Sequence, residues 1–212
     1  RDRPTSIAHD GSNVYSLGIG LSEVPNGTEI LTVTPAGSSI YDKAAREAST
    51  SQSNNTATLN PVAIHRGTDI DGETAGDFSG ISVSMNAAAD RIAIGATGND
   101  DNGSGSGHVR IYEYSSNSWN QLGADIDGEA AGDFSGKVSM NAVGDRVAIG
   151  ANQNDGNGAD AGHVRIYEYS SNSWNQLGAD IDGETAGDFS GTVSMNAAGD
   201  RVAIGASSND GN

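Results

Sequence analysis

The chain has 212 residues and a formal net charge of −17 at pH 7, from 28 acidic and 11 basic side chains. A surface this acidic repels nucleic-acid phosphates and anionic membranes, so we expect neither as a partner. Cysteine is absent, which excludes disulfides and thiolate metal sites, and no apolar run is long enough for insertion into a membrane.

Residues 1–60 come before the repeated part of the chain and show a β pattern. Tyr15, Leu17, Ile19 and Leu21 alternate with small residues, which predicts a half-buried strand. We expect further strands at 30–34, 40–41 and 56–59. The run 42–48 has helix-forming composition but is short, so it predicts one turn of helix between strands.

Residues 21–60 resemble the C-terminal half of an immunoglobulin-like module of bacterial surface proteins. Such modules often carry a Tyr-Asp-x-x-Gly-Asn turn, and this chain has Tyr41-Asp42-Lys43-Ala44-Ala45-Arg46 at that place. The resemblance implies half of a β-sandwich with an open apolar face. The repeat region, a second copy of the chain or a preceding segment would have to cover that face.

A repeat occupies most of the remaining chain, 61–212. Its Asp-Ile-Asp-Gly landmark begins at Asp69, Asp125 and Asp180, so the spacing is 56 and then 55 residues. We place the copies at 67–122, 123–177 and 178–212, the last of them partial. Residues 60–66 stand where an outer strand precedes the next copy. A fixed period of this size indicates a propeller, a solenoid or an array.

Each copy carries four strand signals, which in the second copy fall at 137–141, Arg146–Ala151, 163–169 and 174–177. Both faces of the third strand carry large side chains, as expected when a sheet lies between two neighbours. Small residues such as Gly136 and Gly150 suit positions where backbones approach closely. This pattern predicts an all-β chain of four-stranded, propeller-type blades, with a β-solenoid as the second choice.

The first hairpin turn differs between the copies in one informative way. Gly144 and Gly199 occupy it in two copies, whereas Ala89 occupies it in the other. If the position requires a positive φ, the first copy is strained there.

Ser135-Gly136, a strand, and then Val147-Ala148-Ile149-Gly150-Ala151 resemble the Phe-Gly … Gly-Ala-Pro (FG-GAP) repeat of integrin α-subunit propellers and their bacterial relatives. The resemblance covers 67–212 and implies a β-propeller fold. Serine replaces the motif's Phe in every copy, and Thr97, Asn152 and Ser207 replace its Pro. The family's calcium loop joins the first two strands. Here that connection is only 141–145, so that metal site does not carry over.

The acidic loop around each landmark is the main candidate for a cation site. Its acids stand at loop positions 1, 3, 5 and 9, and a Gly-containing loop can wrap oxygens around Ca²⁺. The alternative is that these carboxylates cap turns and accept backbone N–H bonds. The candidates are Asp69, Asp71, Glu73 and Asp77, then Asp125, Asp127, Glu129 and Asp133, then Asp180, Asp182, Glu184 and Asp188.

A second loop varies between copies, as a binding loop for a surface glycan or protein would, although Asn, Asp and Gly also form ordinary turns. Its candidates are Asn99, Asp100, Asp101, Asn154, Asp155, Asn157 and Asp160. Asn26, Asn54 and Asn102 begin Asn-x-Ser/Thr tripeptides and are candidate glycosylation sites.

Histidine and the aromatic residues also recur from copy to copy. His108 and His163 open the third strand, and we expect them to form hydrogen bonds between repeats rather than to share a metal. Trp119 and Trp174, with nearby tyrosines, could stack on sugars, although packing is the expected role.

These patterns favour a non-enzymatic protein of the extracellular space or cell surface. Nearly every polar residue is repeated in each copy, whereas catalysis needs unlike groups that converge at one place. We expect a structural or adhesive role, with the chain either associating with itself into a filament or forming part of a longer protein. The alternative is a calcium-dependent carbohydrate- or protein-binding propeller of a larger adhesin, and an enzyme on a propeller ranks last.

Overall fold

The computed structural model describes residues 4–9, 15–19, 30–32, 56–58 and 67–211. The chain divides into two compact units, Arg1–His65 and Arg66–Asn212, close to the predicted boundary after residue 60. The expected strand at 40–41, the turn of helix at 42–48, the joint at 60–66 and the sequons at Asn26 and Asn54 lie outside the described residues.

The described part of the first unit is two antiparallel strand pairs. β1 (Pro4–His9) pairs with β2 (Tyr15–Ile19), and β3 (Ile30–Thr32) pairs with β4 (Thr56–Thr58). The strands expected to begin at 15, 30 and 56 are therefore confirmed over the described residues. β1 was not predicted, because Pro-Thr-Ser-Ile-Ala-His has no apolar alternation.

Each of the first two repeats forms one antiparallel sheet whose strands follow chain order. The strands are β5 (Ser79–Met85), β6 (Arg91–Ala96), β7 (His108–Ser115) and β8 (Ser118–Gln121), then β10 (Ser135–Met140), β11 (Arg146–Ala151), β12 (His163–Ser170) and β13 (Ser173–Gln176). The third repeat forms the hairpin β15 (Ser190–Met195) and β16 (Val202–Ala206). The all-β prediction is confirmed, together with the strand positions of the second copy. No helix among the described residues could cross a membrane.

Each of these two sheets is extended by one short strand from the next repeat. β9 (Ile126–Asp127) pairs with the start of β7, and β14 (Ile181–Asp182) pairs with the start of β12. In the second and third copies the Asp-Ile-Asp-Gly landmark is therefore partly strand, where the sequence predicted a loop. The apolar Ile between two polar residues gives the alternation that a strand requires.

The tight turns follow the chemistry of their residues. Ser116 and Asn117, between β7 and β8, have φ values of 52° and 62°, as the favoured two-residue hairpin turn requires. At the first hairpin turn φ is 56° for Ala89 but 81° and 72° for Gly144 and Gly199. The strain predicted for Ala89 is therefore confirmed.

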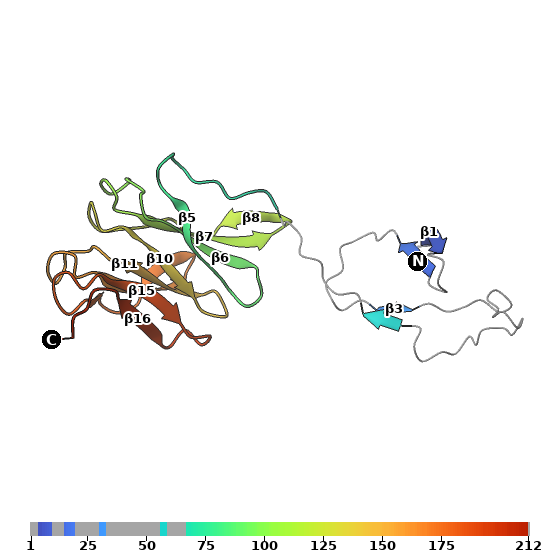
Figure 1. Cartoon of the computed structure of the whole chain (residues 1–212). Helices are drawn as coiled ribbons and strands as arrows, with labels where there is room; N and C mark the ends of the chain where they lie inside the picture. The colour runs from blue at the N-terminus through green and yellow to red at the C-terminus, as the bar shows by residue number, and fades with distance from the viewer. Residues whose placement is uncertain (1–3, 10–14, 20–29, 33–55, 59–66, 212) are drawn as a thin grey trace, which may run out of the picture. The chain divides into compact units, whose positions relative to one another are not determined.

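The repeats stack through their first two strands, with β10 packed on β5 and β6, and β15 packed on β10 and β11 (Figure 1). The same contacts recur at both junctions. Ser84 Oγ accepts from the Met140 amide, and Ser139 Oγ accepts from the Met195 amide, both at 2.9 Å. A core of aliphatic side chains that includes Val109, Val138 and Val147 continues across the first junction.

Close approach of backbones at the junctions requires glycine. A Cβ on Gly95 would lie 1.8 Å from the Gly136 carbonyl oxygen, and one on Gly150 would lie 1.8 Å from the Gly191 oxygen. The prediction that small residues allow this approach is confirmed. Gly205 is the equivalent residue of the third repeat, and a Cβ there would meet only Thr192, at 3.4 Å.

Candidate metal centre

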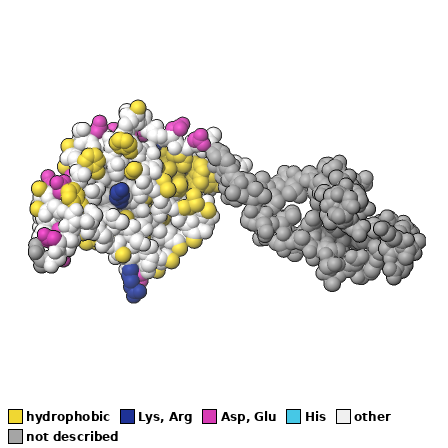
Figure 2. Space-filling view, viewed as in Figure 1, with side chains coloured by type: hydrophobic (Ala, Val, Ile, Leu, Met, Phe, Trp, Pro, Cys, Tyr) yellow, Lys and Arg dark blue, Asp and Glu magenta, His cyan; other side chains and the backbone are white. Residues whose placement is uncertain are grey.

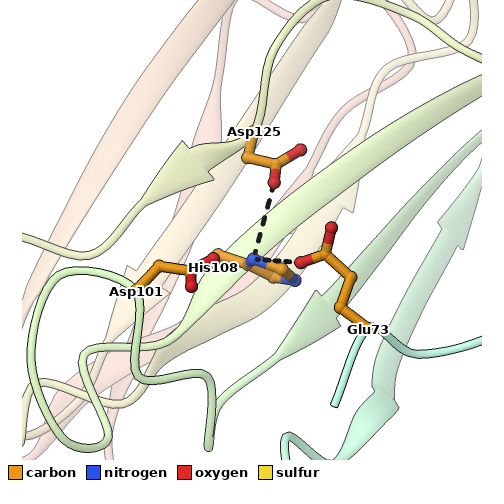
Figure 3. Close-up of side chains that lie close together, drawn as sticks. All are labelled: Glu73, Asp101, His108 and Asp125. Carbon is orange, nitrogen blue, oxygen red and sulfur yellow. Dashed lines mark ion pairs between the residues drawn. The ribbon is translucent and has the colours of Figure 1, made fainter.

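A histidine and three carboxylates converge at the boundary between the first and second repeats (Figure 3). We call Glu73, Asp101, His108 and Asp125 the repeat-1 cluster; one ligand atom from each lies within 4.8 Å of all the others. Glu73 precedes β5, Asp101 lies in the loop between β6 and β7, and Asp125 precedes β9. Four separate segments of chain therefore meet at this point.

His108 forms the floor of the repeat-1 cluster. As the first residue of β7 it is flanked by Ala96 of β6 and Asp127 of β9, and only 1% of it is exposed. Its Nδ1 atom is buried without a hydrogen-bond partner. Nδ1 lies 3.7 Å from Glu73 Oε2 and 3.9 Å from Asp125 Oδ2 (Figure 3), so the ring points into the cluster but bonds to neither carboxylate.

Negative charge dominates the repeat-1 cluster. Its nearest guanidinium is that of Arg110, which lies 3.5 Å from Glu73 Oε1 but donates to the Asp71 carbonyl oxygen at 2.7 Å. Burial, together with the charge of Asp125, raises the pKa of the neighbouring Asp127. Acidic side chains are common at the edges of the face seen in Figure 2, and basic ones are sparse there.

The equivalent group in the second repeat, Glu129, His163 and Asp180, is the repeat-2 cluster, and a protein cation lies inside it. Arg165 donates through Nε and Nη2 to the two carboxylate oxygens of Asp180, each at 2.8 Å, and also contacts Glu129. These hydrogen bonds hold the pKa of Asp180 below its usual value. Burial, aided by Arg165, lowers the pKa of His163.

The predicted calcium-loop acids separate into different environments. Asp77, Asp133 and Asp188 each accept the backbone N–H three residues earlier, at 3.0–3.1 Å. Glu73 instead lies beside His108, together with Asp125 of the following repeat. Glu129 lies beside His163 in the same way, together with Asp180. The acids of one loop therefore do not converge on one point, and calcium binding by these loops stays a prediction.

The remaining acids of the predicted calcium loops have different surroundings in the different copies. Asp127 and Asp182 are paired with His108 and His163 across the sheet, and Asp71 offers its backbone carbonyl to Arg110. Asp69 also has an interaction partner. Glu184 lies 3.4 Å from the Asn209 amide nitrogen.

In the variable loop most of the candidate binding residues hold the loop itself. Asp100 and Asp155 accept the amides of Gly105 and Asp160, at 2.7 and 2.8 Å. Asn99 donates to Asp101, and Asn154 donates to Asp133. Of this set only Asp101 also belongs to the repeat-1 cluster.

Asn102 and Asn157 connect the variable loop to the next repeat. The side-chain amide of Asn102 donates to the carbonyls of Gly128 and Glu129 at 2.7 and 2.9 Å, and that of Asn157 donates to the carbonyls of Gly183 and Glu184. A glycan on Asn102 would remove at least one of these two bonds, because glycosylation replaces one of the two hydrogens on the same nitrogen.

The tryptophans pack against the sheets. Trp119 and Trp174 lie 5.1 Å, centroid to centroid, from Tyr114 and Tyr169. Trp174 is buried and donates its indole N–H to the Leu122 carbonyl at 2.7 Å, across a repeat junction. This arrangement supports the packing role.

The surroundings of the histidines differ from those predicted. We expected bonds between repeats, but Nδ1 of His108 makes none, and each histidine faces two carboxylates instead. Glu73 and His108 are 35 residues apart in sequence, so no local spacing signals their contact. No protein-family model matches this sequence, and no curated protein matches it either.

Proposed function

We propose that this chain is a non-enzymatic structural or adhesive repeat protein of the cell surface or of an extracellular filament. Its repeats would act as propeller-type blades that associate with those of other copies. The support is the ordered antiparallel sheet of each repeat and the stacking of successive repeats on their first two strands. The near-identical polar residues of successive copies serve the blade and favour no catalytic role.

The observation that carries the proposal is the contrast between the junctions and the two outer faces. Inside the described repeats, the first strand of the second repeat buries its apolar side chains against the preceding repeat; Val138 of β10 is 7% exposed and packs with Val109. On β5 the equivalent Val83 is 59% exposed, and Ile81 and Met85 are exposed beside it. A row of exposed apolar side chains of this kind marks an interaction surface.

The opposite outer face, on β15 and β16, has residues equivalent to those that contact the next repeat at the two junctions, but no described repeat follows it. Gly205 occupies the position of Gly95 and Gly150, which lie against the next repeat. Ser194 occupies the position of Ser84 and Ser139, whose hydroxyls accept an amide from the next repeat. The face of β15 and β16 in one copy is therefore suited to β5 of another.

Contact between unlike faces is heterologous, so it produces either a closed ring or an open filament. The proposed occupant of the β5 face is accordingly the third repeat of a second copy. If a further segment of a longer protein covers that face instead, the chain will stay monomeric at every concentration.

The test is the molecular mass of the chain in solution, measured by light scattering over a range of concentrations, with electron microscopy of the products. We expect concentration-dependent assembly that Val83→Lys abolishes. Val143→Lys is the matched control, because Val143 is 63% exposed but lies in the turn between β10 and β11. A compact monomer throughout, or equal loss of assembly in both variants, would overturn the proposal.

A further inference from the structure

We propose that the repeat-1 cluster is a zinc-binding site, formed by His108 Nδ1 with one carboxylate oxygen each from Glu73, Asp101 and Asp125, and that the repeat-2 cluster is not. This site is different from the calcium loops expected from the sequence. It is also independent of association between copies.

The buried ring nitrogen of His108 lacks the partner that a polar atom in a protein interior needs. Side-chain polar atoms in protein interiors nearly always have a partner, and leaving one without a partner costs about 1–3 kcal/mol. His108 Nδ1 is buried, has no hydrogen-bond partner and points between two carboxylates. A cation bound to this nitrogen and to both carboxylates would satisfy all three groups at once.

The set of donor atoms in the repeat-1 cluster selects the class of metal. Ca²⁺ takes six to eight oxygen ligands and Mg²⁺ prefers oxygen and water, so neither makes use of an imidazole. Zn²⁺ binds imidazole nitrogen and carboxylate oxygen, in most cases with four ligands in a tetrahedron. The repeat-1 cluster offers one nitrogen and three oxygens from four residues.

The carboxylates of Glu73 and Asp125 are near the positions that a metal would require and can complete the movement. Tetrahedral ligands at about 2.0–2.1 Å from zinc lie roughly 3.3 Å from one another. The His108 Nδ1 atom is already 3.7 Å from Glu73 and 3.9 Å from Asp125. These two carboxylates have side chains 39% and 26% exposed, so they can move inward and an ion can enter from solvent, while the buried histidine is fixed by its strand.

The repeat-2 cluster provides a comparison within the same molecule. It has a histidine and two carboxylates in equivalent places, but Gly156 replaces the fourth donor, Asp101. Arg165 already binds Asp180 through two hydrogen bonds and contacts Glu129. A cation entering there would have to displace a guanidinium that is hydrogen-bonded to the cluster, whereas Arg110 in the first repeat lies 3.5 Å from Glu73 Oε1 and donates its hydrogen bond to a backbone carbonyl.

Zinc in the repeat-1 cluster would add the segment before β5 to segments that pairing of β7 with β9 already brings together. Glu73 lies ahead of β5, and Asp125 belongs to the segment that leads into the second repeat. The metal would therefore hold the entrance of the first repeat, the loop between β6 and β7, and the start of the next repeat at one point. Binding only the folded form, it would raise the melting temperature.

The experiment is calorimetric titration of the metal-free full chain with ZnCl₂, with thermal melting as a second readout. We expect one Zn²⁺ per chain, micromolar or tighter affinity, a higher melting temperature with zinc, and no displacement by millimolar Ca²⁺. Asp101→Gly, which gives the first repeat the residue of the second, should weaken binding roughly tenfold or more. His108→Gln should abolish it.

His163→Gln is the matched control and should leave both stoichiometry and affinity unchanged. Circular dichroism of each variant without metal shows whether it folds, and Asp101→Gly lies in a loop, so it tests the site even if His108→Gln does not fold. The proposal is overturned if the wild-type chain binds no zinc at 100 µM, a concentration about a hundred times the expected dissociation constant. It is also overturned if His163→Gln or Ca²⁺ abolishes binding, or if Asp101→Gly binds as tightly as the wild type.

Discussion

The close approach of repeat backbones gives the sharpest prediction for stability, and the perturbation is Gly150→Ala. The added Cβ would lie 1.8 Å from the Gly191 carbonyl oxygen. Ordinary carbon–oxygen contact begins near 3.4 Å, so the second and third repeats would have to separate by roughly 1.5 Å. No side chain can rotate away to relieve this clash, because both groups belong to the backbone.

That separation would break bonds that cross the junction. The Met195 amide donates to Ser139 Oγ at 2.9 Å and the Ala142 amide donates to the Ala197 carbonyl at 3.0 Å. Each such bond is worth about 1 kcal/mol, and overpacking itself typically costs about 1–3 kcal/mol. The loss of unfolded-state freedom on replacing Gly returns about 0.4–1 kcal/mol. We therefore expect a net destabilisation of about 3 kcal/mol.

The assay is urea unfolding followed by circular dichroism. With an m value of about 2 kcal/mol/M, the midpoint should fall by roughly 1.5 M. Gly205→Ala is the matched control in the third repeat, where the new Cβ would meet only Thr192, at 3.4 Å, and its midpoint should not fall. Equal midpoints for the two variants would refute the argument that the repeats are held backbone to backbone.

Three further predictions concern the first hairpin turn, acid stability and calcium. Ala89→Gly should stabilise the chain by about 1 kcal/mol because φ is 56° at this residue, whereas Ala88→Gly should destabilise it slightly; thermal melting of both would show opposite shifts. Hydrogen bonds from Arg165 hold the pKa of Asp180 below its unfolded value of about 3.9, so their contribution is present above pH 4 and is lost as the pH falls below it. Urea midpoints measured from pH 5 to pH 2.5 should therefore fall less for Asp180→Asn than for the wild type, and parallel curves would contradict this. Millimolar Ca²⁺ should raise the melting temperature if the acidic landmark loops bind it, and an unchanged melting temperature would end that hypothesis.

The strands of the repeats were predictable because each needs only local information. Apolar residues at every second position predict the strands Arg146–Ala151 and His163–Ser170. Ala89 stands where the other two copies have Gly, and this difference predicts the backbone strain at Ala89. The short strand β1 was missed because its sequence has one aliphatic residue of any size, Ile7. Its pairing with β2 supplies what local propensity does not.

The candidate metal centre could be predicted only in part, since its members come together through pairing across the sheet. Asp125 and Glu73 were recognised as possible ligands because they belong to acidic motifs. We expected each acidic loop to bind a cation with its own acids, but the fold combines acids of two loops. Ile126 pairs with Val109, and this pairing brings Asp125 to the histidine of the preceding repeat. That register is a long-range property, and the four residues of one motif contain no signal for it.

The extra residue in the first repeat explains why the two landmark spacings differ, and it bears on association between copies. β5 shifts register between Ser79 and Ser82, whereas β10 shifts between Ser135 and Lys137, so the additional residue is Ile81. Ile81 is 54% exposed on β5, on the face that no described repeat covers. Gly205 lies on the opposite outer face, where an added Cβ would meet only Thr192 because no described repeat packs on it either. A second copy seated with its β15 and β16 on β5 would therefore cover Ile81 together with Val83, at a junction one residue longer than those within the chain.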